Sequence, residues 1–378
     1  MRNDDRAWLI LANAKVRASE YGSLSGCFGT AAKIVELGAT ALQKSGLASD
    51  KADAIANPDV EHLQLELEWL QQDRHHIVKL GGDDYPELIG QISDPALLLY
   101  VDGDPGALQL PALAIVGSRN PTSGGTRNAF DFAQHLGACG FSIVSGLAQG
   151  IDTAAHRGAI AGGATTIAFL GNGIDRVYPA ANRDLAHEIA EHGALVSEYS
   201  LGSPPDRRHF PQRNRLISGA SLGTLVIEAA RRSGSLITAR LAAEQGREAF
   251  ALPGSIHNPL ARGCHQLIRQ GAKLVETADD IVAELAPLVS HVLQNAVEST
   301  MNDAPEPAHD EQYSELQKYL SHDPIGVDEL AEQSGLTIEQ VSSMLLILEL
   351  QGRVEALSGG QYSMLTKGAA NRPRENSS

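Results

Sequence analysis

The chain has 378 residues, a length that predicts two or three domains rather than one small core. Its formal net charge of −16 argues against a protein that coats nucleic acid through a generally basic surface, although it allows a local basic groove. The sequence shows no apolar run long enough to span a bilayer and opens with charged residues, unlike a signal peptide, so we expect a cytoplasmic protein with no membrane partner.

Residues 1–80 form the first predicted unit, a small all-α module. Apolar residues around Trp8 and Ile34 recur at helical spacing, and residues 63–70 continue the pattern. Small helical modules with glycine turns sometimes bind DNA backbone and sometimes only pack against a neighbour, and both interpretations stay open here. A short strand-like segment at 77–80 ends the unit.

Residues 81–288 form the predicted central domain, in which apolar strands alternate with helical patterns. The predicted strands cover residues 113–117, 141–146, 165–170, 194–198, 223–229, 248–253 and 272–275. Strands rich in Val, Ile and Leu that alternate with helices predict an α/β fold with a parallel sheet and helices on both faces. In such sheets ligands bind beyond the carboxyl ends of the strands.

The C-terminal part reads as a linker, a small domain and a tail. We expect a linker at 289–310, where Pro, Asp and Asn cannot build a core, and a disordered tail at 367–378. Between them, helices at 313–320, from 325 and at 338–350, then a hairpin over 353–364, predict a winged-helix domain at 311–366.

The predicted winged helix is acidic. Between Glu311 and Met364 the only basic residues are Lys318 and Arg353, against nine acidic ones. Helices that enter a DNA major groove usually bring Arg or Lys to phosphates and bases. We therefore expect this domain to contact protein or support a dimer rather than bind duplex DNA.

Glycine-rich loops follow four of the predicted strands. The first is Gly117-Ser118-Arg119, and the others lie at 145–152, 171–173 and 231–235. Glycine lets backbone N–H groups approach an anion, and helix N-termini favour negative charge. Strand-to-helix turns need glycine in any case, but four such loops at one sheet edge favour anion binding.

Other chemistries lack support in the sequence. No GxGxxG fingerprint follows the first strand and no GxxxxGK[ST] motif occurs, so we predict no nucleotide cofactor. The three cysteines are far apart and lack metal-ligand spacing, so we predict no metal site. Asp152 and Glu228 could act as acid or base, but helix capping for Asp152 and a strand-end hydrogen bond for Glu228 explain them equally well.

Arginines gather between Asp206 and Arg247. The eight are Arg207, Arg208, Arg213, Arg215, Arg231, Arg232, Arg240 and Arg247. Within 207–221 they alternate with His209, Phe210 and Asn214. Arginine pairs with phosphate and an aromatic ring stacks on an unpaired base, so the segment favours single-stranded nucleic acid. The alternative, in which Phe210 belongs to the core and the arginines pair with acidic side chains, stays open.

These motifs resemble the DNA-processing protein A family (DprA, also called Smf). The matching segments are AIVGSRNPTSGG at 114–125, SGLAQGIDTAAHRGAI at 145–160, LGNGIDRVYPAAN at 170–182, FPQRNRLISGAS at 210–221, VIEAARRSGSLITARLAAEQGREAFALPGSI at 226–256 and GCHQLIRQGA at 263–272. They cover the central domain in order. The resemblance implies an extended Rossmann-like central domain at 81–288, a SAM-like helical module at 1–80 and a winged helix at 311–366.

The resemblance also implies a function and a set of site residues. It implies a dimer that binds single-stranded DNA entering by transformation, protects it and loads the RecA recombinase, without catalytic activity or cofactor. Carried over by motif, Arg119 with Gly117 and Ser118 would hold phosphate, and Phe210 would contact a base. The other residues expected at the same pocket or at a second phosphate-facing turn are Arg213, Asn214, Arg215, Gly234, Ser235 and Thr238, with Arg207, Arg208, Gly171 and Asn172 as additional contacts.

A second resemblance supplies the alternative function. Residues 221–228 are similar to the PGGxGTxxE motif of the cytokinin riboside-phosphate hydrolases, which share a Rossmann-like fold. Ala220 and Ser221 replace the glycine pair of that motif, and Glu228 falls one residue late. The alternative is therefore a hydrolase that processes nucleotides.

Overall fold

The computed structural model describes residues 2–288 without a break, and then residues 316, 319–320, 325–334, 341, 345, 354–357 and 361–364. The chain divides into two compact units, Met1–Gln294 and Asn295–Ser378. The predicted linker and tail lie outside the described residues, as does most of the helices predicted at 313–320 and 338–350. The predicted domain boundaries stay predictions. No helix among the described residues is both long and apolar enough to cross a membrane.

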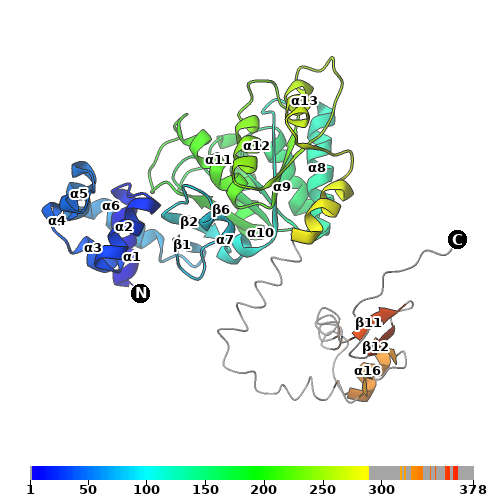
Figure 1. Cartoon of the computed structure of the whole chain (residues 1–378), viewed down its shortest axis with the longest axis horizontal. Helices are drawn as coiled ribbons and strands as arrows, with labels where there is room; N and C mark the ends of the chain where they lie inside the picture. Colours follow the sequence, from blue (N-terminus) through cyan, green and yellow to red (C-terminus); the bar gives the residue numbers. More distant parts are fainter. Residues whose placement is uncertain are drawn as a thin grey trace. The chain divides into compact units, whose positions relative to one another are not determined.

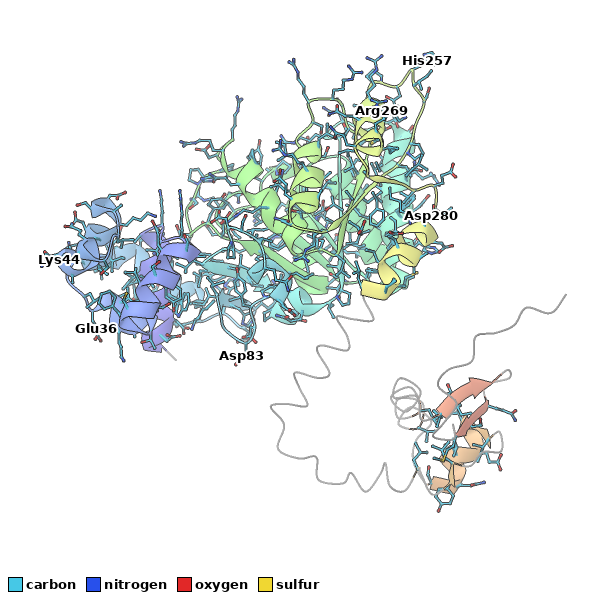
Figure 2. All side chains as sticks on the ribbon, viewed as in Figure 1. Glu36, Lys44, Asp83, His257, Arg269 and Asp280 are labelled. Atoms are coloured by element: carbon cyan, nitrogen blue, oxygen red, sulfur yellow. The ribbon has the colours of Figure 1, made fainter. Side chains whose placement is uncertain are left out.

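Residues 2–69 fold into a helical module, drawn in blue in Figure 1; Glu36 and Lys44 mark it in Figure 2. Its helices are α1 (Arg2–Asn13), α2 (Ala18–Phe28), α3 (Ala31–Val35), α4 (Ala39–Lys44), α5 (Ser49–Ala56) and α6 (Val60–Trp69). Trp8 of α1 packs on Tyr21 of α2, with ring centroids 4.7 Å apart. The core of the module continues into Leu98 and Tyr100 of the neighbouring sheet, so the module is built onto that sheet.

The sheet has nine strands in the order β1-β2-β6-β5-β4-β3-β7-β8-β9. Their bounds are β1 His75–Lys79, β2 Leu98–Gly103, β3 Ala112–Gly117, β4 Ser142–Ser145, β5 Thr166–Phe169, β6 Gly193–Ser197, β7 Gly223–Ile227, β8 Glu248–Ala251 and β9 Lys273–Leu274. The strands from β6 to β9 in this order are parallel to one another, whereas β2 pairs antiparallel with β6 and β1 antiparallel with β2. The sheet therefore begins at β1, ahead of the domain boundary predicted after residue 80.

Helices cover both faces of the sheet, as the alternation of apolar side chains along β3 requires. Leu113 and Ile115 point to one face, beneath α8 (Ser123–Ala138), α9 (Ile151–Ala161) and the helical residues 278–288. Ala114 and Val116 point to the other face. The elements of that second face are α7 (Glu87–Gly90), η1 (Pro105–Gln109), α11 (His209–Gly219), α12 (Ser235–Glu244) and α13 (Ala261–Arg269). The short η2 (Ala180–Asn182) and α10 (Arg183–His192) complete the unit, and α10 shares the core of the helical module.

The strand order reverses between β3 and β7. From β3 the chain adds β4, β5 and β6 on one side, then returns to place β7 on the other side of β3. The helix that follows β3 is α8 and the helix that follows β7 is α12, and these two helices lie on opposite faces of the sheet. The loops after β3 and β7 therefore diverge, and this is the position where open α/β sheets bind ligands.

The described part of the second unit is a small helix-and-sheet fragment. Strand β10 (Ile325–Gly326) leads directly into α16 (Val327–Ser334), and β11 (Val354–Leu357) forms an antiparallel pair with β12 (Gln361–Met364). We expected residue 325 to begin a helix. Instead, residues 325–326 form a third strand beside β12, because the hairpin leaves an edge that they can pair with.

Candidate nucleic-acid interface

The loop Gly117-Ser118-Arg119 leaves the sheet at the carboxyl end of β3. A Cβ atom on Gly117 would lie 2.0 Å from the carbonyl oxygen of Ile227, so only glycine fits between β3 and β7 there. The carbonyl of Ser118 accepts a hydrogen bond from the Ile151 N–H at 3.1 Å, which fixes the loop against the start of α9. The side chain of Arg119 is exposed beyond this anchor.

Glu228, directly after β7, ties the same loop to the sheet from the other side. Its carboxylate accepts hydrogen bonds from the Thr122 N–H at 2.7 Å and from the Thr122 hydroxyl at 2.6 Å. Glu228 has φ +52°, in the left-handed region that favours glycine. Of the two interpretations left open by the sequence, the geometry favours the strand-end hydrogen bond over an acid or base role.

Arg119 and Phe210 face each other at this edge of the sheet. The guanidinium carbon lies 5.7 Å from the centroid of the Phe210 ring, in cation–π geometry. Phe210 is half-buried at the start of α11, and its ring lies against Gly171, where a Cβ would come within 2.9 Å of it. The ring thus lies beside the loop after β5 and within cation–π distance of Arg119.

Asn172 shapes the loop after β5 rather than presenting its side chain to solvent. The side chain is buried, and its amide donates to the carbonyls of Gly173 at 3.0 Å and Arg176 at 2.7 Å. The backbone carbonyl of Asn172 accepts from the Ser197 hydroxyl at 2.6 Å. Its predicted contact with DNA stays a prediction, and the side chain that the structure describes is already engaged within the protein.

Arg213 lies behind the strand ends and is only 4% exposed. Its Nη1 donates to the carbonyl oxygen of Gly146 at 3.0 Å and also to that of Phe169. Burial lowers the pKa of Arg213 to about 10, opposed by the charge of Asp152. Burial likewise raises the pKa of Asp152, whose carboxylate accepts from the N–H groups of Gly146 at 3.1 Å and Ala148 at 3.3 Å. Arg213 and Asp152 therefore hold the ends of β4 and β5 in place.

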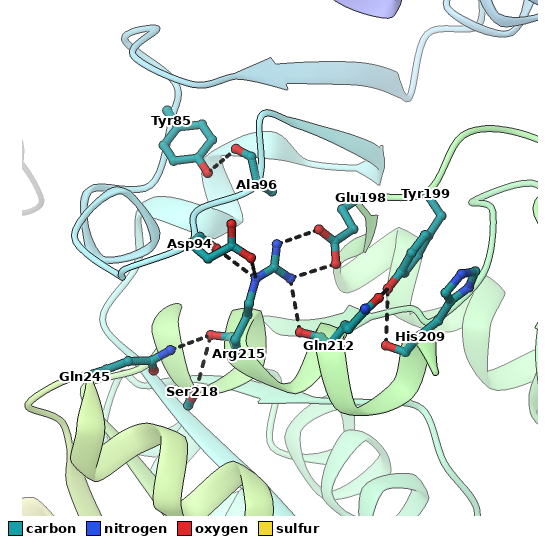
Figure 3. A network of polar contacts seen from close by, with 10 residues as sticks. All are labelled: Tyr85, Asp94, Ala96, Glu198, Tyr199, His209, Gln212, Arg215, Ser218 and Gln245. Carbon is teal, nitrogen blue, oxygen red and sulfur yellow. Dashed lines mark hydrogen bonds and ion pairs between the residues drawn. The ribbon is translucent and has the colours of Figure 1, made fainter. Parts of the chain in front are cut away.

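Arg215 belongs to a separate network, drawn in Figure 3. Its guanidinium donates to both carboxylate oxygens of Glu198, at 2.7 and 2.6 Å, and its Nε donates to the Asp94 carbonyl at 2.8 Å. Burial alone would lower the pKa of Arg215, but the hydrogen bonds and charge of Glu198 hold it above its ordinary value. Arg215 thus fastens α11 to the end of β6 and to the loop before β2.

Arg213 and Arg215, which were expected at the same pocket, therefore do not lie on one surface. The segment 209–219 is a helix, and residues two apart on a helix point about 200° apart. Arg213 consequently points beneath the strand ends while Arg215 points to Glu198 on another side. Contact of Arg213, Asn214 and Arg215 with DNA stays a prediction, but both guanidinium groups are occupied by protein acceptors.

The turn predicted to face a second phosphate lies at the start of α12. Gly234 is exposed there, but Ser235 is 7% exposed and Thr238 only 1% exposed. The hydroxyls of Ser233 and Ser235 lie 2.7 Å apart, within hydrogen-bond distance of each other. Exposed groups of this turn are the Gly234 backbone and the preceding Arg231 and Arg232.

Arg207 and Arg208 are both exposed, just before α11. Arg208 is paired with Asp206 through contacts of 3.1 and 2.7 Å, and these hydrogen bonds lower the pKa of the Asp206 carboxyl. Arg207 has no acidic partner within 4.0 Å among the residues that the structure describes. Of these two arginines, Arg207 is therefore the one whose guanidinium is not paired with an acidic side chain in that part of the chain.

Two cavities of the first unit lie away from these residues. They measure about 470 and 410 Å³, and Trp69 and Asp175 line both. Neither of these two cavities is lined by Arg119 or Phe210. In the described part of the chain, no three His, Cys, Asp or Glu side chains come together as a metal ion would require.

Two features of this surface were missed in the sequence. Tyr178 lies beside Phe210, with ring centroids 5.6 Å apart, and Thr122 donates hydrogen bonds to the carboxylate of Glu228. The only local signal for Tyr178 was its place in the loop after the third predicted strand, near the glycines at 171 and 173. No local signal pointed to the pairing of Thr122 with Glu228, because 106 residues separate them.

Comparison with known proteins identifies the family. Residues 76–286 match the family model of DNA recombination-mediator protein A, and residues 301–360 match that of the DprA winged helix domain. The chain is 40% identical to Protein Smf of Escherichia coli K12 over 330 residues, which cover 87% of this chain and 88% of that protein.

Solved structures agree with the sequence comparison. The crystal structure of DprA from Streptococcus pneumoniae matches with a TM-score of 0.65 and 36% identity, over 75% of this chain and 98% of that one. A structure concerned with the single-stranded DNA binding mode of DprA from Helicobacter pylori matches with a TM-score of 0.51 and 30% identity, over 56% of this chain and 96% of that one. These matches favour a recombination mediator over a nucleotide hydrolase. The Rossmann-like fold with a winged-helix domain is thereby confirmed, and the chain belongs to the DNA recombination-mediator protein A family, also known as DprA or Smf.

Proposed function

We propose that this chain binds single-stranded DNA at the surface formed by Arg119 and Phe210. One observation carries the proposal. An exposed arginine, with no acidic partner within 4.0 Å in the described part of the chain, lies 5.7 Å from the ring of a half-buried phenylalanine at the carboxyl end of the parallel strands. A guanidinium can hold a phosphate while an adjacent ring stacks on an unpaired base.

The preference for single strands follows from the same pair. In a duplex the faces of the bases are stacked on one another, so Phe210 can stack only on a base that is unpaired. The relative from Helicobacter pylori, whose structure concerns its single-stranded DNA binding mode, supports extending this ligand to the present chain.

We further propose that the protein acts in the cytoplasm as a homodimer that protects the strand and delivers it to RecA, without catalysing a reaction. Family membership supports this role. We place the dimer contact at Ile256, in the loop between β8 and α13, which at 72% is the most exposed large apolar side chain in the described part of the chain; it lies next to His257, which Figure 2 labels. The carboxylate of Glu228, the candidate acid of the alternative hydrolase, is engaged by Thr122.

Fluorescence anisotropy with labelled oligo-dT tests DNA binding. Arg119→Ala should weaken binding roughly ten- to a hundredfold, the range expected for one charge-assisted hydrogen-bonded contact. Lys44→Ala removes one positive charge from the helical module, away from the strand ends, and should bind like the wild type (Figure 2). Equal affinity of the wild type and Arg119→Ala would exclude the proposed surface.

Two further measurements test the partners. Light scattering should give the mass of a dimer for the wild type and of a monomer for Ile256→Asp, because a buried, unpaired carboxylate is costly at an interface.

RecA ATPase activity on DNA that carries a single-strand-binding protein should rise when the wild type is added and should not rise with Arg119→Ala. A monomeric wild type, or no rise in activity, would contradict the dimer or the delivery role respectively.

A further inference from the structure

Tyr178 is an aromatic side chain that the fold leaves in solvent. It is 46% exposed, and among the described residues it is the only Phe, Tyr or Trp that is exposed rather than buried or half-buried. It lies in the loop between β5 and η2. The exposed ring is accessible to a ligand, and tyrosine, with an apolar ring and a polar hydroxyl, is a residue type enriched at binding interfaces.

The loop that carries Tyr178 is fastened at both ends. At its start the buried Asn172 donates to the carbonyl of Arg176 at 2.7 Å. At its end the buried Asn182 donates to the carbonyl of Leu147 and to the hydroxyl of Thr153, both at 2.9 Å. The exposed ring is therefore held in place by buried amides and is not simply the tip of an unsupported loop. A ring fixed in this way loses little entropy when a ligand binds to it.

Tyr178 continues the surface that Arg119 and Phe210 begin. Its ring centroid lies 5.6 Å from that of Phe210 at an interplanar angle of 45°, and Arg119 lies 5.7 Å from Phe210. The three side chains come from three separate loops or helices, and Phe210 lies close to both of the others. A phosphate-binding group and two rings gathered in this way match one phosphate and two neighbouring bases of an extended strand.

We propose that Tyr178 is a second base-stacking residue, so that this surface takes two successive unpaired bases of a single strand, one on Phe210 and one on Tyr178. The inference rests on the proposed function and deepens it by setting how many bases the surface contacts. The tilt of 45° between the rings means that the two bases cannot stay stacked on each other. The strand is therefore bent or splayed at this step, which a duplex does not permit.

The first test compares variants of the same residue on oligo-dT. Tyr178→Ala and Tyr178→Leu should each bind about tenfold more weakly than the wild type, whereas Tyr178→Phe, which keeps the ring, should bind like the wild type. Because Tyr178 is exposed, its variants should retain the wild-type melting temperature. Leu that binds as well as Phe would overturn the proposal, because apolar bulk without an aromatic face would then suffice.

The second test assigns each base to a ring. The shortest oligo-dT that retains full affinity fixes the register, and single abasic positions are then moved along it. In the wild type two neighbouring abasic positions should weaken binding. In Tyr178→Ala one of them should lose its effect, and in Phe210→Ala the other should. An abasic profile of Tyr178→Ala that matches the wild-type profile would overturn the proposal.

The outcomes separate this inference from the proposed function. If Arg119→Ala loses affinity while Tyr178→Ala does not, the surface binds DNA and Tyr178 is not part of it. If neither variant loses affinity, the surface itself is misassigned. Loss of affinity in both, with rescue by Tyr178→Phe, supports both.

Discussion

The carboxylate of Glu228 accepts hydrogen bonds from both the backbone N–H and the hydroxyl of Thr122, at 2.7 and 2.6 Å, across 106 residues of sequence. The Thr122 hydroxyl also accepts from the Gly125 N–H at 3.0 Å and so caps α8. One carboxylate thus joins the end of β7 to the start of α8. The loop that presents Arg119 runs from the end of β3 to α8, and Thr122 is its last residue, so this tie fixes that end of the loop.

Removing this tie should weaken DNA binding without removing any predicted DNA contact. Glu228 has φ +52°, which costs a non-glycine residue about 1 kcal/mol. Glu228→Gly relieves that cost and Glu228→Ala does not, although both lose the carboxylate. We expect both variants to bind oligo-dT about fivefold more weakly, a modest loss for a contact that acts indirectly. Glu228→Gly should be the more stable of the two in urea denaturation.

Comparing Glu228→Gly with Glu228→Ala distinguishes an effect on the position of Arg119 from an effect on the stability of the protein. If weaker binding came only from partial unfolding, Glu228→Gly would bind better than Glu228→Ala in proportion to its stability. Wild-type affinity in both variants would show that the tie does not position Arg119.

The salt dependence of binding should report the phosphate contact of Arg119. Each phosphate neutralised on a single strand contributes about 0.7 to the slope of log K against log salt concentration. Arg119→Ala should therefore reduce the magnitude of that slope by about 0.7, and Lys44→Ala should leave it unchanged. The measurement is a series of anisotropy titrations at several salt concentrations. A slope unchanged in Arg119→Ala would mean that Arg119 acts on a base or on Phe210 rather than on phosphate.

The sheet was largely predictable because its central strands are buried on both faces. The apolar run at 113–117, for example, corresponds to β3 at Ala112–Gly117. Such runs follow from parallel strands covered by helices, and they leave little choice of fold class. The sequence predicted strand character at 77–80 but not that β1 pairs with β2 in this sheet, because the sequence of a short strand does not specify its pairing partner.

The site was less predictable because the sequence of α11 does not show a helical pattern. Residues 209–215 are mostly polar and include Pro211, so no apolar stripe indicates a helix. Pro211 lies in the first turn, where a missing N–H costs little, and the helix forms. Without that helix, Arg213 and Arg215 look like neighbours on one surface. With it, they point to different partners.

Arg215→Ala should destabilise the protein more than it weakens DNA binding. Arg215 and Glu198 have side chains that are 15% and 16% exposed, and the pair is bidentate. Losing Arg215 leaves the carboxylate of Glu198 largely buried without its cation, at a cost of about 2–3 kcal/mol in the free energy of unfolding. Urea denaturation measures the loss, and anisotropy under strongly native conditions should show affinity within about threefold of the wild type.

A double variant provides the control for Arg215. In Arg215→Met/Glu198→Gln the largely buried carboxylate of Glu198 is removed together with its cation, and the Asp94 carboxylate, which Arg215 also contacts at 3.2 Å, is 59% exposed. This variant should therefore recover part of the stability lost in Arg215→Ala. A large loss of affinity in a fully folded Arg215→Ala would return Arg215 to the DNA-binding surface that the sequence suggested.

Acidification should destabilise the protein through His156 of α9. The imidazole is fully buried, and burial, together with the charge of Arg213, lowers its pKa from 6.5 to about 3. Its Nδ1 lies 2.7 Å from the Thr166 hydroxyl, which itself donates to the Ile143 carbonyl, so the neutral ring is the donor to Thr166. Because the pKa is lower in the folded state, the unfolded chain binds the extra proton between about pH 3 and 6.5. Stability therefore falls as the pH falls through that window.

The pKa difference of His156 between the folded and unfolded chain sets how much the free energy of unfolding changes with pH. Between pH 8 and pH 5, His156 alone should remove about 2 kcal/mol from the free energy of unfolding. In His156→Gln that contribution is absent, so the variant should lose about 2 kcal/mol less than the wild type over the same range in urea denaturation. Asp152, whose raised pKa acts in the opposite direction, is present in both proteins and largely cancels in the comparison. His257→Gln, at an exposed position, should keep the wild-type pH dependence. An equal loss in wild type and His156→Gln would mean that His156 takes up its proton in the folded state too, and that the buried ring lies within reach of solvent.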